Sequence, residues 1–236
     1  MNKPRITILL LILFSCSTYG ENSEKHTCRV LFLDRPASMP KTLHLFDGTT
    51  SHEVDLPSWN LSRIYELPSG PLDLALLTDP VDNPKKLPSG APKASVPGDM
   101  VDFYLLVSED PENKVVPVKI KVIQAGVKHL TPGQMLWVNL TDYKVNGKLG
   151  SETLIVEPQS QMTMNSPVKE NADYSVSLAY RIPDNETTYP LCETRWGHNS
   201  RSRAIALIFT QTGSRIPRVS VFHDYRVIAP KEPAAP

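Results

Sequence analysis

The sequence has no excess of charge of either sign and no long apolar segment beyond its first residues. Its 236 residues hold 25 Lys and Arg against 25 Asp and Glu, with a pI near 7.0. A chain with balanced charge gives no indication of the basic surface that nucleic-acid binding needs. No apolar run reaches the ~20 residues of a membrane-spanning helix. We therefore expect no nucleic-acid partner and no transmembrane span.

Catalytic motifs are also missing. The chain has no phosphate-binding loop, nucleotide-binding fingerprint or paired acid motif. A Cys192–His198 dyad would join residues only six positions apart, whereas such dyads generally draw their partners from distant segments. A zinc site would need His26 and Cys28 to meet Cys192 and His198. We expect no enzyme, cofactor or metal site, and we hold hydrolase as the least favoured alternative.

The first twenty residues have the order of a secretory signal peptide. Lys3 and Arg5 precede an apolar run from Ile6 to Phe14, and small and polar residues follow. Residues 1–20 therefore predict export to the periplasm or the outside. An alternative is a lipoprotein, because "LFSC" (13–16) is similar to a bacterial lipobox with Cys16 as the lipidated residue, which would add a membrane anchor.

Cysteine is scarce, with three in the chain. Removal or modification of Cys16 leaves Cys28 and Cys192. Because an exported chain meets an oxidising compartment, we predict a disulfide between these two. Two separate thiols are the alternative, since spacing alone does not bring two Cα atoms within ~7 Å.

Proline is abundant, with 22 residues, and it disfavours long helices. No window has a convincing 3.6-residue period, whereas short alternating or continuous apolar runs recur between turn residues. They include "CRVLFLD" (28–34), "LDLALL" (72–77), "VDFYLLV" (101–107) and "VVPVKIKVI" (115–123). The prediction is an all-β protein.

The second half repeats the order of the first. Counterparts of the last three runs lie about 103 positions later, and Asp47-Gly48 and Asn146-Gly147 give hairpin turn signals in both halves. We predict two tandem immunoglobulin-like or fibronectin-like β-sandwiches of about seven strands each. They would span 27–125 and 132–229, with a boundary near 124–133 and a disordered tail at 230–236.

The segment 29–76, with a strand, a D-G hairpin, an aromatic-bearing strand and an "LPSG" turn in that order, resembles a bacterial family of exported immunoglobulin-like repeats of unknown function. The resemblance covers the first half, and the second half more faintly. It implies a sandwich fold and an exported location, and it carries over no catalytic residues.

The stretch "PLCETRWGHNS" (190–200) gathers most of the reactive side chains. The repeat places it in a long loop of the second half, whose counterpart in the first half is the proline-rich loop 78–99. One interpretation is structural, with Trp196 covering the edge of the core. The other is a recognition surface made by Arg195, Trp196 and His198, since aromatic and guanidinium groups are typical of binding hot spots.

The predicted function is a non-enzymatic scaffold or interaction module of the cell envelope, whose partner is a protein or a glycan. A glycan- or peptide-binding domain that uses the loops at one sandwich end is the alternative.

Overall fold

The protein is built of β-strands. The computed structural model describes residues 24–126, 129–183 and 187–226. In these ranges the regular structure consists of strands β1 to β16 and one short 3₁₀ segment, η1 (Pro84–Lys86), with no α-helix. The all-β prediction is confirmed.

The strands fall into two successive groups of eight. The first group is β1 (His26–Phe32), β2 (Thr42–Phe46), β3 (Ser51–Asp55), β4 (Tyr65–Leu67), β5 (Leu72–Leu77), β6 (Lys93–Val96), β7 (Asp102–Glu109) and β8 (Val118–Gln124). The second is β9 (Gln134–Asn139), β10 (Lys144–Leu149), β11 (Glu152–Val156), β12 (Gln161–Asn165), β13 (Asp173–Arg181), β14 (Thr188–Gly197), β15 (Arg203–Thr210) and β16 (Pro217–Asp224). We call the two groups the N-half and the C-half.

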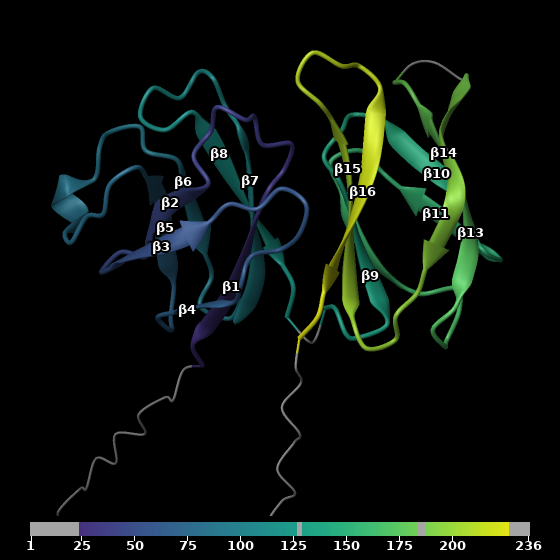
Figure 1. The fold of residues 1–236 in the computed structure, drawn as a ribbon, viewed down its shortest axis with the longest axis horizontal. Coiled ribbons are helices and arrows are strands. Elements are labelled where there is room, and N and C mark those ends of the chain that lie inside the picture. The colour runs from purple at the N-terminus through teal and green to yellow at the C-terminus, as the bar shows by residue number, and fades with distance from the viewer. Residues whose placement is uncertain (1–23, 127–128, 184–186, 227–236) are drawn as a thin grey trace, which may run out of the picture.

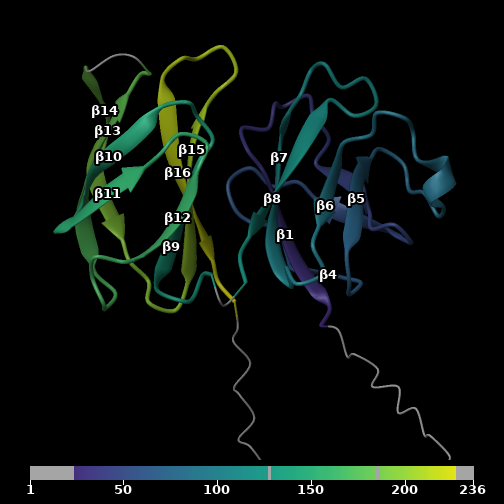
Figure 2. The same ribbon diagram turned by 180° about the vertical axis from the view of Figure 1, so that it is seen from behind.

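Both halves have the same strand order. The N-half forms sheet A (β4-β1-β7-β8) and sheet B (β3-β2-β5-β6), and the C-half forms sheet C (β12-β9-β15-β16) and sheet D (β11-β10-β13-β14). The pairs β5 and β13, β7 and β15, and β8 and β16 therefore hold equivalent places. These are the strands whose spacing in the sequence indicated a repeat. Figure 2 shows β12 beside β9 from behind.

Two features differ from the expected immunoglobulin-like sandwich, a fold class with about seven strands in antiparallel sheets. Each half has eight strands, and β1 pairs with β7, and β9 with β15, in parallel. A parallel pair needs a long crossover connection. In each half the intervening chain supplies it by forming the other sheet before it returns.

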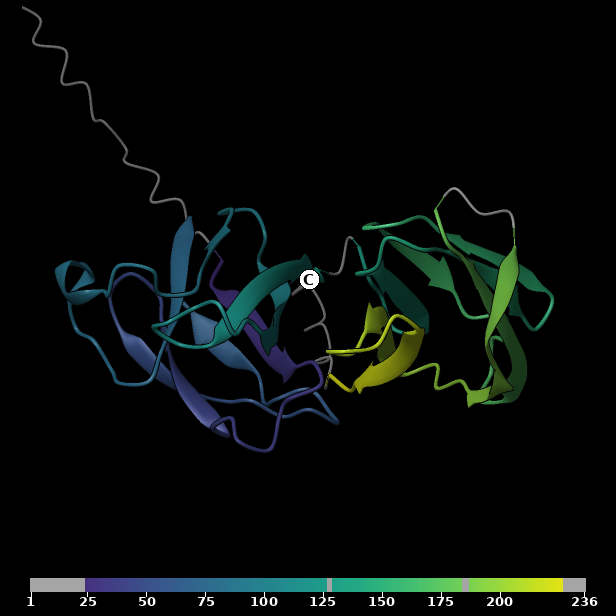
Figure 3. The same ribbon diagram turned by 90° about the horizontal axis from the view of Figure 1, so that it is seen from above.

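The four sheets stack in the order B, A, C, D, as the labels from one side of Figure 1 to the other show, and the view from above agrees (Figure 3). Three apolar clusters fill the spaces between them. One holds Leu45 and Leu105 between sheets A and B, and another holds Trp137 and Leu178 between sheets C and D. The cluster between sheets A and C joins the two halves and includes Leu106 and Leu207.

The sequence of β7 explains why sheet A is covered on both faces. Its residues Asp102–Val107 are all buried. Because neighbouring side chains on a strand point to opposite faces, Phe103 and Leu105 pack toward sheet B while Tyr104 and Leu106 pack toward sheet C. A continuous apolar run, rather than alternation, is typical of a strand buried on both faces.

Only one of the two predicted hairpin turns forms where it was expected. Gly48 has φ +99° between β2 and β3, and Asp47 Oδ1 accepts hydrogen bonds from the N–H groups of Thr49 and Thr50. The Asn146-Gly147 prediction is wrong, because both residues lie inside β10 and the turn to β11 falls at Gly150 (φ +55°). A Cβ at position 147 would lie 2.1 Å from the carbonyl oxygen of Ser177, so glycine permits close approach there rather than a turn.

We expect Gly147→Ala to destabilise the C-half strongly. The added methyl group meets the β13 backbone, which cannot rotate away as a side chain could, so the cost lies at or above the ~1–3 kcal/mol typical of overpacking. Urea unfolding of the variant measures it. Gly126→Ala is the matched control, because its Cβ would meet nothing nearer than 4.0 Å. Equal unfolding midpoints for Gly147→Ala and the wild type would contradict the close approach.

The prediction of a loop at 190–200 is also wrong for most of that segment. Residues 188–197 form β14, which pairs with all of β13 with a register shift between Leu178 and Ala179. The equivalent N-half segment, 78–99, contains only η1 and the short β6. Strand β13 offers a nine-residue edge to pair with, and this tertiary partner overrides the turn-like composition of the segment.

Candidate binding groove at the junction of the two halves

The facing strands of sheets A and C share one pattern on the faces that meet. Along this face, β7 presents Asp102, then Tyr104 and Leu106, then Ser108. Strand β15 presents Arg203, then the apolar side chains of 205, 207 and 209, then Gln211 beyond its end. The junction therefore has a charged end, an apolar centre and a polar end.

The charged end is closed by a buried ionic cluster. Asp224 is fully buried, and its carboxylate accepts hydrogen bonds from Tyr104 Oη at 2.6 Å and from Arg29 at 2.5 Å. It also pairs with Arg203, and with Arg226 at 3.0 Å. Four groups from both halves thus converge on one carboxylate.

Asp102 is the second acid of the cluster. Arg203 Nη1 donates to Asp102 Oδ2 at 3.0 Å and to the carbonyl of Ala125 at 2.7 Å, and Arg226 lies 2.7 Å from Asp102. Arg226 also donates to Thr27 Oγ1 at 3.3 Å, so the end of β16 lies beside the start of β1. Both strand ends are at the lower end of Figure 1.

The cluster holds Asp224 in its ionised form. Burial alone would raise the pKa of this carboxyl, but the hydrogen bond from Tyr104 and the positive charges of Arg203 and Arg226 lower the pKa to about 2. Burial and the neighbouring Asp224 charge raise the pKa of the Tyr104 hydroxyl, so it remains a hydrogen-bond donor.

We expect the protein to lose stability in acid as Asp224 protonates. A carboxyl with a pKa near 3.9 when unfolded and about 2 when folded stabilises the folded state fully above pH ~4, by about 2–3 kcal/mol. The contribution disappears as the pH falls through 2. Urea unfolding at several pH values measures it, with Asp224→Asn as the reference that lacks the titration. If the difference in unfolding free energy between the wild type and Asp224→Asn stays constant from pH 5 to about 2, the assignment is contradicted.

The opposite end of the junction is open and forms a groove of about 750 Å³. It lies near the β15–β16 loop, at the upper end of Figure 1. The groove has an apolar floor, which continues the cluster between sheets A and C, and polar walls from both halves. Its lining residues are Leu33, Asp34, Leu106, Ser108, Glu109, Lys119, Ile120, Lys121, Leu140, Gln159, Phe209, Thr210, Gln211, Thr212, Gly213 and Ser214.

Two hydrogen bonds tie the walls together across the junction. Gln211 Nε2 donates to Asp34 Oδ1 at 2.7 Å, and Thr212 Oγ1 donates to Glu109 Oε2 at 3.3 Å. Lys119 and Lys121 are exposed on β8, which is an edge strand of sheet A. The groove thus offers apolar contact area, amide and hydroxyl groups, two carboxylates, two ammonium groups and an edge of β8 that pairs with no other strand. These are groups for binding, and they include no thiol or imidazole that could act as a nucleophile or base.

The predicted recognition residues do not form one surface. Trp196 points inward from β14 and stacks on Trp137 at 5.7 Å between ring centroids, as the structural interpretation expected. Arg195 is exposed on the opposite face of β14. His198 follows the strand, and its pKa is lowered by partial burial and by the nearby His223.

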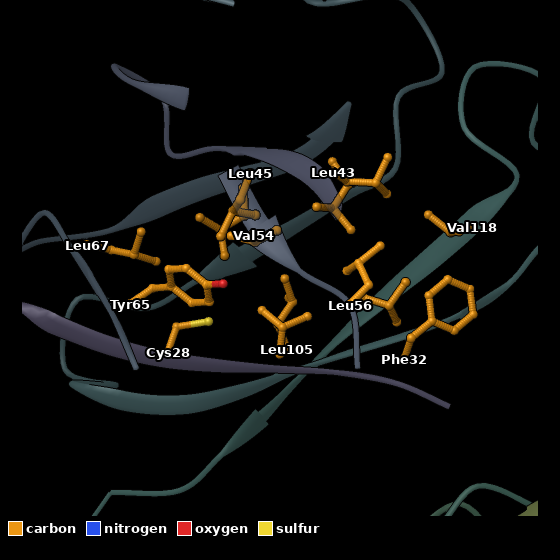
Figure 4. Packing of buried hydrophobic residues seen from close by; sticks show 14 of the residues in the cluster. Cys28, Phe32, Leu43, Leu45, Val54, Leu56, Tyr65, Leu67, Leu105 and Val118 are labelled. Atoms are coloured by element: carbon orange, nitrogen blue, oxygen red, sulfur yellow. The ribbon is translucent and has the colours of Figure 1, made fainter. Parts of the chain in front are cut away.

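The predicted disulfide is absent, since Cys28 and Cys192 are free. Cys28 is fully buried between sheets A and B, where Figure 4 shows it beside Tyr65 and Leu105. Cys192 packs against the cluster between sheets C and D. Two further layers of the stack separate these cores, so strand alternation and layer order keep the thiols apart.

We expect the two thiols to differ in reactivity. Burial raises the pKa of both, far more at Cys28 than at the half-buried Cys192. A thiol reagent should modify Cys192 slowly in the folded protein and Cys28 only after unfolding, and peptide mass spectrometry distinguishes the sites. Denatured, unreduced protein in which neither site takes up the reagent would contradict the free thiols.

Some predicted features lie outside the described residues: the signal peptide at 1–20, the alternative lipidation site Cys16 and the tail at 230–236.

Within the described ranges, no group of three or more His, Cys, Asp or Glu side chains could hold a metal ion, and His26 instead contacts the carbonyls of Met100 and Gly70. In the same part of the chain, no helix has the length and hydropathy to span a membrane.

Sequence reasoning missed both the groove and the ionic cluster. The available signal was the continuous apolar character of "DFYLLV" and "AIALIF", which indicates strands covered on both faces. Asp102 and Arg203, which begin these two runs, would then stand at the rim of a second interface.

No protein-family model matches this chain, and no curated protein matches it.

Proposed function

We propose that the protein is a non-enzymatic binding module that takes an extended peptide segment of a partner protein into the junction groove. The observation that carries this is the groove itself, with its apolar floor between two polar walls from different halves. Ligand sites occur preferentially at the interfaces between structural units, where apolar surface is combined with polar groups that fix the orientation of the ligand.

The groove chemistry favours a peptide with acidic and apolar residues, because the carboxylates of Asp34 and Glu109 already accept hydrogen bonds across the junction whereas the lysines of the groove are exposed. Strand β8 leaves one edge unpaired, and an extended peptide can add to such an edge through backbone hydrogen bonds. Lys119 and Lys121, two residues apart, point to the same face and would pair with acidic side chains of the peptide. Leu33 and Phe209 offer apolar contacts below them.

A displayed library of random peptides tests the proposal. Peptides enriched on the wild-type protein should combine acidic with apolar residues. Their affinity, measured by fluorescence anisotropy, should fall about tenfold or more for Lys119→Glu/Lys121→Glu.

The matched control is Lys148→Glu, a charge reversal at an exposed lysine of β10 in sheet D, which sheet C separates from the groove. This variant should bind as the wild type does. No enrichment, or equal losses in both variants, would contradict the groove as the binding site.

A second candidate rests on Trp59, whose side chain is 93% exposed on the loop after β3. An exposed indole can stack on the apolar face of a sugar ring, which favours the glycan alternative. A glycan array probed with the wild type and with Trp59→Ala separates the candidates, since a saccharide whose binding depends on Trp59 supports the second one.

The proposed setting is the cell envelope, for which the N-terminal residues and their export pattern are the support. We further propose that each half is an immunoglobulin-like sandwich with a rearranged strand order. The repeated order of the four-stranded sheets supports this, while the parallel β1–β7 and β9–β15 pairs depart from that fold class.

A further inference from the structure

Strand β14 is an unpaired edge with self-complementary charges. It is the last strand of sheet D, and Glu193 and Arg195 are exposed on it. Their cross-strand neighbours on β13 are the uncharged Ser177 and Ser175. Among the described residues, neither side chain has an ion-pair partner.

The hydrogen-bond pattern shows which backbone groups face outward. The His198 N–H donates to the Ala172 carbonyl at 2.9 Å, and the carbonyl of Ser175 accepts from Gly150 on the other side of β13 at 2.7 Å. Backbone bonding alternates from residue to residue along an antiparallel pair. The backbone groups of Glu193 and Arg195 therefore point away from β13, toward the free edge.

We propose that β14 pairs antiparallel with β14 of a second copy of this chain, around a two-fold axis at Thr194. This register sets Glu193 opposite Arg195 of the partner copy, and Arg195 opposite Glu193 of the partner copy. Both are outward-bonding positions, as an antiparallel ladder requires. Opposite charges directly across a ladder stabilise it, and like charges destabilise it.

Neighbouring registers do not share this match. A two-fold axis at position 193 or 195 would put two carboxylates or two guanidinium groups opposite each other. Parallel in-register pairing would do the same at both positions. Pro190, which has no N–H, limits the ladder at one end.

The interface is separate from the proposed groove, because sheet C lies between sheet D and the junction. A dimer formed through β14 leaves both grooves open. Because the ladder is short, we expect a dissociation constant in the micromolar range, typical of small interfaces.

Sedimentation equilibrium of the full chain tests the proposal. The wild type should dimerise reversibly with rising concentration. Glu193→Arg and Arg195→Glu should each weaken self-association by about tenfold or more, because each sets like charges opposite each other. An equimolar mixture of the two variants should associate again, as should the double exchange E193R/R195E. A monomeric wild type, or association unchanged by the single variants, would overturn the proposal.

A cross-link locates the two-fold axis. Thr194 would face its own copy in a non-hydrogen-bonded pair with Cα atoms ~4.5 Å apart, which is within disulfide range. In a Cys192→Ser background, Thr194→Cys should form a disulfide-linked dimer on mild oxidation, detected by non-reducing electrophoresis. Thr153→Cys on β11, the opposite edge of sheet D, is the control and should remain monomeric. Cross-linking at Thr153 but not at Thr194 counts against β14, and circular dichroism verifies that every variant is folded.

Discussion

Asp224→Ala is expected to lower the free energy of unfolding by about 3–5 kcal/mol, the cost of breaking a buried ion pair by removing one partner. The substitution leaves Arg203 and Arg29 without their shared carboxylate and Tyr104 without its acceptor. Asp102 alone cannot balance the three arginines of the cluster. Urea unfolding followed by tryptophan fluorescence measures the loss.

Asp82→Ala is the matched control, because Asp82 also pairs with a basic residue, Lys86 at 2.7 Å, but on the surface. Surface pairs contribute little, so its unfolding midpoint should stay close to that of the wild type. Asp224→Asn keeps the size of the side chain and should be destabilised as well, because it lacks the charge. If Asp224→Ala unfolds at the same urea concentration as Asp82→Ala, the cluster does not hold the two halves together.

Trp137→Ala is expected to cost about 3–5 kcal/mol, as truncation of a buried aromatic residue typically does. Trp137 is fully buried between sheets C and D, and its ring stacks on Trp196, which in turn meets Tyr174 edge-on at 6.5 Å. The alanine leaves a cavity in the middle of this aromatic group. Thermal or urea unfolding records the loss, together with a changed near-ultraviolet circular dichroism signal from Trp196.

Two variants sharpen the Trp137 prediction. Trp137→Phe should cost less than the alanine, because it retains an aromatic ring and the Trp137 Nε1–H has no hydrogen-bond partner among the described residues. Trp59→Ala removes the same side chain from an exposed position and should leave stability nearly unchanged. Equal stability for Trp137→Ala and Trp59→Ala would show that the C-half core does not depend on this residue.

Local chemistry was sufficient for the strand content and the order of the repeat. The alternation in "VKIKV" and the Asp47-Gly48 turn depend on residues that are close in the chain, and both appear where they were predicted. The Asn146-Gly147 signal failed for a tertiary reason. Its glycine is needed for close contact with Ser177 on β13, a neighbour that only the sheet supplies.

Local residue patterns did not predict the candidate site. The stretch at 190–200 concentrates reactive residue types, yet strand alternation sends Arg195 and Trp196 to opposite faces. Oxidation chemistry suggested a disulfide, yet Cys28 and Cys192 pack into different cores. Residue type indicates what a side chain can do, whereas only its neighbours in space decide whether it does so.

The amino-acid order alone therefore determined an all-β chain in two similar halves, because alternation and turn chemistry act over a few residues. How the halves meet was decided by the tertiary structure. Sheet A packs on sheet C through apolar faces that each strand would otherwise expose to water, and burial of this surface places Asp102, Arg203 and Asp224 in one cluster. The groove at the other end exists because the same two faces become polar there, at Ser108 and Gln211.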